Sequence, residues 1–90
     1  MEAIRIKLTI ENRLGLHARP AMSFVDAASQ FKSDIKVIKD GQAVDGKSIM
    51  QLLTLMVPTG TQLEIAAEGP DAEQAINALQ KLVESKFDED

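Results

Sequence analysis

In the first 31 residues the spacing of apolar side chains changes. It begins as every second residue and continues as the spacing of a helix. Residues 4–10 alternate between apolar and polar side chains, which is typical of a strand with one buried face. Further along, helical spacing relates Ala18, Ala21, Met22, Val25 and Ala28, which predicts a helix to about residue 31. Because the residue before a proline disfavours the α conformation, we expect this helix to be regular from Arg19 or Pro20.

The rest of the chain predicts three more strands and two more helices. We expect strands at residues 34–39, 42–45 and 62–67, with Asp40-Gly41 as a two-residue hairpin turn. Ser48 and Asp71 each stand three residues before a glutamine, a capping-box pattern that predicts two helix starts. These helices extend to residue 55 or 56 and to about residue 83. We expect residues 87–90 to form a loose acidic tail.

The predicted order β-α-β-β-α-β-α describes an α+β two-layer sandwich. Each strand has one apolar face and each helix one apolar stripe, so one sheet covered by helices would bury both. Residues 1–90 contain no linker or repeat, and we expect a single domain. The pattern alone does not determine the order of the strands.

The helix after Ser48 is richer in apolar residues than a helix of two turns can bury. We expect Leu52, Leu55 and Met56 in the core. We expect Ile49, Met50 and Leu53 to be exposed as a patch that docks on partner proteins, because exposed apolar clusters commonly mark interaction sites.

Composition excludes several function classes. The net charge is −4 and the only aromatic residues are three phenylalanines, which disfavours nucleic-acid binding. The chain has no cysteine and one histidine, so we expect no metal site and no disulfide, and nothing indicates a cofactor. The sequence shows neither a signal peptide nor an apolar run long enough to span a membrane. We expect a cytoplasmic monomer.

The single histidine, His17, stands where the first strand leads into the first helix. A helix start attracts anions because its outward N–H groups and its dipole are positive. The guanidinium of Arg19 would add a planar fork that suits phosphate oxygens. The same positive field favours the neutral imidazole, the form that acts as a nucleophile. These residues indicate a phosphoryl acceptor, whereas the alternative is that His17 only caps the helix.

The chain contains two distinctive motifs, Gly15-Leu16-His17-Ala18-Arg19-Pro20-Ala21 and Lys47-Ser48-Ile49-Met50. Both resemble motifs of the HPr family, the histidine-containing phosphocarrier proteins of the bacterial phosphotransferase system. The similarity extends along essentially all 90 residues. It implies an antiparallel sheet of order 1-4-2-3 with three helices on one face.

The resemblance also implies a function and site residues. His17 would take a phosphoryl group on Nδ1 from enzyme I, which obtains it from phosphoenolpyruvate, and pass it to a IIA component. The protein would be a carrier rather than a stand-alone enzyme, with Arg19 stabilising the phosphate. Ser48 would be the target of a regulatory kinase, HPr kinase/phosphorylase, as in some bacteria. The partner-binding residues would be Ala18, Lys47, Ile49, Met50 and Leu53.

Other functions remain open at the level of sequence. A small acyl-phosphate hydrolase also holds phosphate with an arginine, but the loop after the first strand lacks a glycine-rich cradle. A non-catalytic regulatory domain would use His17 only as a cap. Relatives of HPr that are regulated only through serine lack the histidine, which this chain has. The sequence also leaves open whether the chain serves sugar uptake or nitrogen-linked regulation.

Overall fold

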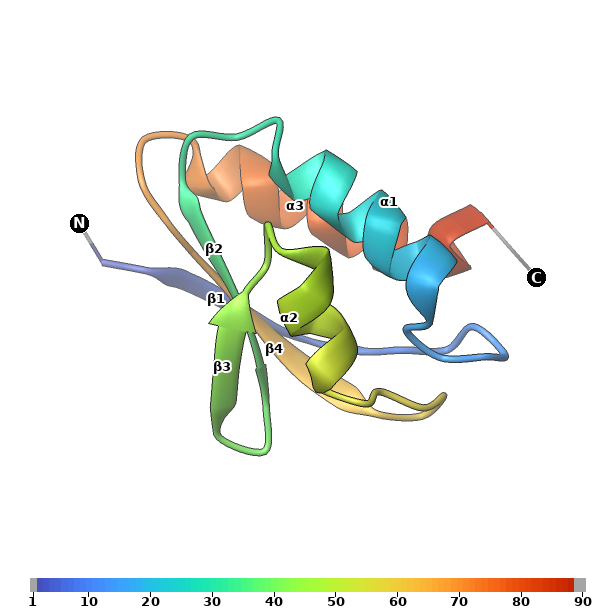
Figure 1. Ribbon diagram of the computed structural model, residues 1–90. Coiled ribbons are helices and arrows are strands. Elements are labelled where there is room, and N and C mark those ends of the chain that lie inside the picture. The colour runs from blue at the N-terminus through green and yellow to red at the C-terminus, as the bar shows by residue number, and fades with distance from the viewer. Residues whose placement is uncertain (1, 89–90) are drawn as a thin grey trace.

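The computed structural model describes residues 2–88 and contains every predicted strand and helix in the predicted order (Figure 1). The elements are β1 (Ile4–Thr9), α1 (Ala18–Ala28), β2 (Asp34–Lys39), β3 (Gln42–Asp45), α2 (Ile49–Thr54), β4 (Gln62–Glu68), α3 (Ala72–Glu84) and the short turn η1 (Lys86–Asp88). Helix α1 begins at Ala18, slightly before the expected start, with His17 as its N-cap residue.

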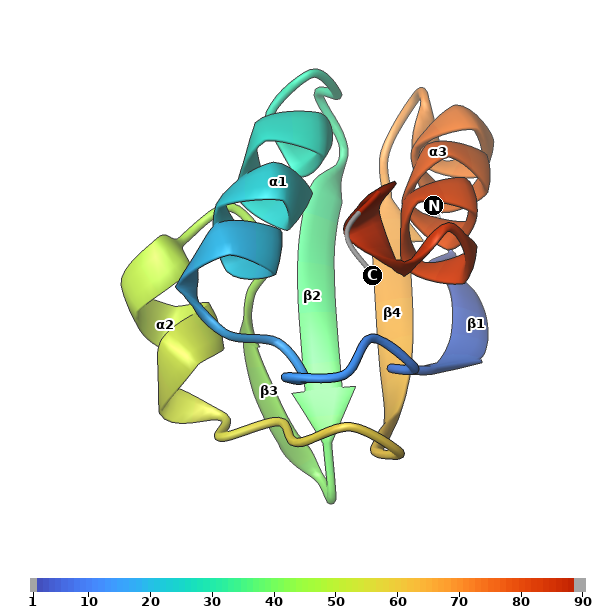
Figure 2. The ribbon, with the colours of Figure 1, turned by 90° about the vertical axis from the view of Figure 1, so that its right-hand side faces the viewer.

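The four strands form one antiparallel sheet of order β1-β4-β2-β3. Ile65 of β4 pairs with Ile6 on one side and with Val37 on the other, so β4 lies inside the sheet. Helix α3 packs on β1 and β4, α2 packs near β3, and α1 contacts both helices, which places all three on one face (Figure 2). The predicted α+β sandwich and its strand order are confirmed.

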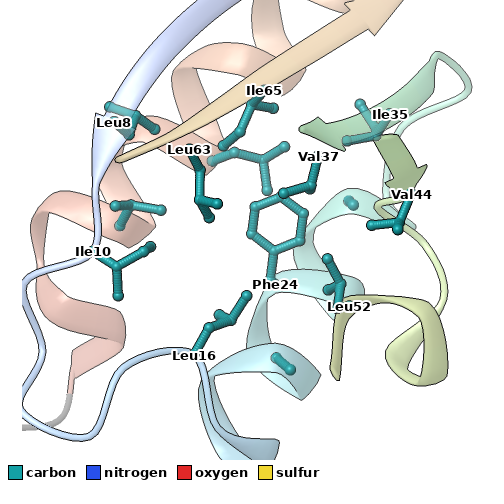
Figure 3. Packing of buried hydrophobic residues seen from close by; sticks show 14 of the residues in the cluster. Leu8, Ile10, Leu16, Phe24, Ile35, Val37, Val44, Leu52, Leu63 and Ile65 are labelled. Atoms are coloured by element: carbon teal, nitrogen blue, oxygen red, sulfur yellow. The ribbon is translucent and has the colours of Figure 1, made fainter. Parts of the chain in front are cut away.

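The core lies between the sheet and the helices. The ring of Phe24 from α1 lies at its centre, surrounded by strand residues and by Leu16 and Leu52 (Figure 3). Alternate residues of the strands point toward it, as the period of two predicts, and Ile35, Val37 and Ile65 are almost fully buried.

The turn between β2 and β3 is the predicted hairpin. Asp40 and Gly41 have φ angles of 51° and 83°. Positive φ at both central positions defines a type I′ turn, whose twist matches that of the paired strands.

Four local predictions were wrong. Met22 was counted in the apolar stripe of the first helix but is 51% exposed, while Phe24, which the stripe left out, is buried because it faces the sheet (Figure 3). Met56 was expected in the core but is 75% exposed, because its φ of 55° turns the chain sharply after α2. The expected loose tail instead contains Phe87, which is buried against the core, and residues 89–90 of that prediction lie outside the described residues. The side chain of Asp71 does not cap α3. Its carboxylate instead accepts hydrogen bonds from Lys32 and Ser33, in the α1–β2 connection.

Candidate functional site

The connection between β1 and α1 carries His17, and Asn12 fixes its shape. Asn12 is fully buried, and its side-chain amide donates a hydrogen bond to the carbonyl of Gly15. In the opposite direction, the backbone amide of Gly15 donates to the carbonyl of Asn12 at 3.0 Å. These two bonds close residues 12–15 into a tight turn directly before the histidine.

Gly15 allows this turn to pack against the segment that follows α2. Its φ is 70°, in the left-handed region. A Cβ atom there would overlap the carbonyl oxygen of Val57 and lie 2.8 Å from Cα of Pro58. The amide of Leu16 donates to the same Val57 carbonyl at 2.8 Å. Glycine alone fits both the conformation and the close approach, so the His17 segment is fastened to the α2–β4 connection.

His17 occupies the N-cap position of α1. Its backbone is extended, with φ −80° and ψ −172°, and its carbonyl accepts the first helical hydrogen bond from the amide of Ala21 at 3.0 Å. The half-buried side chain makes no capping hydrogen bond to the helix. The imidazole is therefore not used to satisfy the helix's own amides, which removes the main support for His17 as a simple cap.

The first turn of α1 has the features of an anion site. The amides of Ala18 and Arg19 precede the first helical hydrogen bond, and Pro20 contributes no N–H. Both Ala18 and Arg19 are exposed, and no acidic side chain lies in this turn. Two amides, a guanidinium and the helix dipole thus favour a negatively charged group beside His17.

A shallow apolar groove lies next to the histidine. It is lined by Leu14, Leu16, His17, Leu53, Met56, Val57 and Pro58. Leu53 was predicted for the docking patch, whereas Leu14, Met56 and Pro58 were missed. Leu14 is 64% exposed, and its position in a turn beside Gly15 was a usable signal. Met56 gave none, because its spacing is that of a core residue.

The predicted docking patch is divided between the two ends of α2. Met50 is 79% exposed and Leu53 39% exposed, as expected, while Ile49 is half-buried. Leu53 lies in the groove with His17, but Met50 stands in the first turn of α2. Of the three predicted patch residues, only Leu53 therefore lines the groove beside the histidine.

Ser48 is the N-cap residue of α2, as predicted. Its hydroxyl oxygen accepts a hydrogen bond from the amide of Gln51 at 3.2 Å. The side chain of Gln51 does not complete the capping box, because its Oε1 accepts from the amide of Asp45 at 2.9 Å. The groove lies at the opposite end of α2, and a helix of six residues is about 9 Å long. The structure therefore separates Ser48 from the His17 groove by the length of this helix.

Lys47, another predicted partner-binding residue, has a contact inside the protein. Its Nζ donates a hydrogen bond to the carbonyl of Phe31 at 2.7 Å. Its backbone amide donates to Oδ1 of Asp45 at 2.9 Å. Lys47 thus ties the start of α2 to the segment after α1.

Residues 2–88 contain no group of three or more histidine, cysteine, aspartate or glutamate side chains placed to hold a metal ion. Over the same residues, none of the helices is long and apolar enough to cross a membrane.

Comparison with known proteins identifies the family. A family model described as the PTS HPr component phosphorylation site matches residues 4–85. The phosphocarrier protein HPr of Treponema pallidum is 43% identical over 79 residues, which cover 88% of this chain and 90% of that protein.

Solved structures agree in fold as well as in sequence. HPr-C-His from Thermoanaerobacter tengcongensis is 48% identical with a TM-score of 0.94, covering 97% of this chain and 98% of that one. A structure described as an HPr dimer from the same organism is 50% identical with a TM-score of 0.78, covering 93% and 97%. On the strength of the matched motif region, the relatives and the fold, this chain belongs to the HPr family of phosphocarrier proteins of the phosphotransferase system.

Proposed function

We propose that His17 accepts a phosphoryl group on Nδ1 from phosphorylated enzyme I and passes it to a histidine of a IIA component. The observation that carries this proposal is the N-cap histidine whose side chain does not cap its helix. Family membership favours this function over an acyl-phosphate hydrolase or a non-catalytic domain. The proposed partners are cytoplasmic, and we place the protein in the same compartment.

The transfer needs a nucleophile and a cradle for phosphate. A ring nitrogen of His17 attacks phosphorus while the bond from phosphorus to the donor histidine breaks, and the donor nitrogen keeps that electron pair. No proton has to move if each ring keeps its other N–H. The amides of Ala18 and Arg19, with the Arg19 guanidinium, stabilise the charge on the transferred oxygens. The reverse attack by an acceptor histidine releases the group.

The test is labelling with enzyme I and phosphoenolpyruvate. We expect one phosphoryl group per chain by mass spectrometry, labile in acid and stable in alkali as a phosphoramidate is. His17→Ala should remove the label, and a thermal melt of that variant shows whether it is folded. Label that persists in folded His17→Ala would refute the proposal.

We also propose that phosphorylation of Ser48 by HPr kinase/phosphorylase slows the transfer without unfolding the protein. A negative group at the start of α2 is compatible with the helix dipole, so the fold tolerates it. It would lie beside Ile49 and the exposed Met50, in the surface proposed to contact partners. Because about 9 Å of helix separates it from the groove, it acts on docking rather than on the His17 ring.

Ser48→Asp tests this regulation as a mimic with a single charge. We expect the melting temperature to stay close to that of the unmodified protein while enzyme I phosphorylates the variant more slowly. Desolvation of the charge on docking sets the scale, on the order of 1–3 kcal/mol for a full phosphate and less for aspartate. Ser48→Ala is the matched control, since it removes the cap without adding charge. A normal rate for folded Ser48→Asp would exclude Ser48 from the docking surface.

We propose that the carrier acts as a monomer, because His17 must reach two partners in turn. Static light scattering of the purified chain during phosphorylation tests this state. A stable dimer that is the phosphorylated species would contradict it.

A further inference from the structure

Met56 stands immediately after α2 in a conformation that suits glycine. Its φ is 55°, in the left-handed region, directly after the C-cap residue Leu55. Helices commonly end with glycine at this position because a Cβ atom is strained there. A methionine that occupies such a position therefore weakens the fold.

Burial of the side chain does not offset this backbone strain. Met56 is 75% exposed, while the following residue, Val57, is only 7% exposed. The sharp turn thus directs a large apolar side chain outward and buries its neighbour. That side chain lines the groove shared with His17. Strain and exposure together indicate that Met56 is retained for a contact outside the chain.

Lys39 of β2 holds this segment from one side. Its Nζ donates hydrogen bonds to the carbonyl of Leu55 at 2.9 Å and to that of Met56 at 2.7 Å. On the other side, the amide of Leu16 donates to the carbonyl of Val57. The left-handed turn is therefore fixed between the sheet and the loop that carries His17.

We propose that Met56 is a specificity-determining contact for phosphoryl transfer, packing against an apolar surface beside the phosphohistidine of the donor protein, with Lys39 as its positioning residue. This rests on the proposed function, because the donor must come within bonding distance of His17 and so covers the adjoining groove. A flexible thioether suits a carrier that docks on two different partners, since methionine repacks against differently shaped surfaces.

The decisive variant is Met56→Gly, which removes both the strain and the side chain. We expect its melting temperature to equal or exceed that of the unmodified protein. We expect the KM of enzyme I for the carrier to rise about five- to tenfold, the range of a modest interface contact, with kcat unchanged. Met56→Leu keeps an apolar side chain, so its KM should stay close to that of the unmodified protein. Asp40→Gly is the matched control, because it relieves another left-handed residue, at φ 51° in the hairpin, and should leave KM unchanged.

Lys39 is tested by the same measurements. Lys39→Met keeps the aliphatic stem but loses the ammonium, so we expect a lower melting temperature and a raised KM, and Lys39→Arg should restore both. An unchanged KM in Met56→Gly overturns the inference while leaving the proposed function intact. A lower melting temperature in Met56→Gly also overturns it, because the side chain would then stabilise the fold. Absence of phosphorylation in the unmodified protein overturns both proposals.

Discussion

Helices α1 and α3 both begin with a residue whose side chain does not cap the helix, yet the two starts differ in what that residue does. At α3 the carboxylate of Asp71 accepts hydrogen bonds from the amides of Lys32 and Ser33, both at 2.9 Å, and from the Ser33 hydroxyl at 2.6 Å. At α1 the imidazole of His17 lines an apolar groove. The N-cap side chain of α3 therefore joins the β4–α3 connection to the α1–β2 connection. The N-cap side chain of α1 instead lies in a surface groove.

The two helix starts also differ in the number of acidic side chains that they carry. The first turn of α3 carries Glu73, while that of α1 has no acidic side chain. The hydrogen bond from the Ser33 hydroxyl, followed by that from the Lys32 amide, lowers the pKa of Asp71 to about 2. The start of α3 carries two acidic side chains of the chain itself, Asp71 and Glu73. The first turn of α1 carries none and is suited to an anion that arrives from outside.

Among these variants, Gly15→Ala should cause the largest loss of stability, because it disturbs the packing of the loop before α1 against Val57 and Pro58. The new Cβ would overlap the Val57 carbonyl on a backbone with φ 70°, and we expect a loss of about 3 kcal/mol in the free energy of unfolding. Gly60→Ala is the control, because Gly60 has φ 88° but nothing within 4 Å, and should lose only about 1 kcal/mol. Urea denaturation measures both, and equal losses would mean that the approach to Val57 is unimportant.

The next effect should come from Asp71→Asn, which weakens the α3 start. The pKa of Asp71 is about 2 in the folded chain and 3.8 as the ordinary value, so the unfolded chain binds more protons between these values. The stabilisation is present above the ordinary pKa of 3.8 and is lost as the pH falls through the folded value of about 2.

Melts of the unmodified protein and of Asp71→Asn from neutral pH down to pH 2 check this expectation. We expect a clear deficit for the variant near neutrality that shrinks as the pH falls. Asp26→Asn, at an exposed position of α1, is the control. A deficit that stays constant across the range would mean that the ionised carboxylate is not what joins the two connections.

The smallest effect should come from giving α1 the side-chain cap that it lacks. His17→Asn places a strong capping residue on an extended N-cap backbone, and we expect it to be about 1 kcal/mol more stable than His17→Ala. Both variants should lose phosphorylation. Urea midpoints of the two variants provide the comparison, and equal midpoints would indicate that the helix start cannot use a cap.

Much of the architecture and the location of the site could be predicted from the sequence because both depend on local patterns. Alternation predicts the strands, and helical spacing predicts the helices. In α1 the spacing predicted the buried face only in part, because it included Met22, which is 51% exposed, and left out Phe24, which is buried. His17, Gly15 and Arg19 lie within five residues, so their proximity needed no tertiary information. The hairpin at Asp40-Gly41 was likewise set by two adjacent residues.

The wrong predictions involve residues whose environment is set by distant parts of the chain. Asp71 has the pattern of a cap, but two amides and a hydroxyl from residues 32 and 33 compete for its carboxylate. Met56 has the spacing of a core residue, but the backbone turns under the hold of Lys39. Phe87 follows a polar stretch in the sequence, yet it lines the same interior space as Leu16. None of these contacts leaves a periodic signal.

The order of the strands has a consequence for how the chain folds during synthesis. β1 leaves the ribosome first, yet its partner in the sheet is β4, where Ile4 pairs with Ala67. Until β4 emerges, the alternating apolar face of β1 has no strand to pair with, whereas the β2–β3 hairpin can close locally. Such non-local pairing is slow because a long loop must close first. The loop that carries His17 follows β1 directly, so we expect the surface around His17 to be among the last parts of the molecule to take shape.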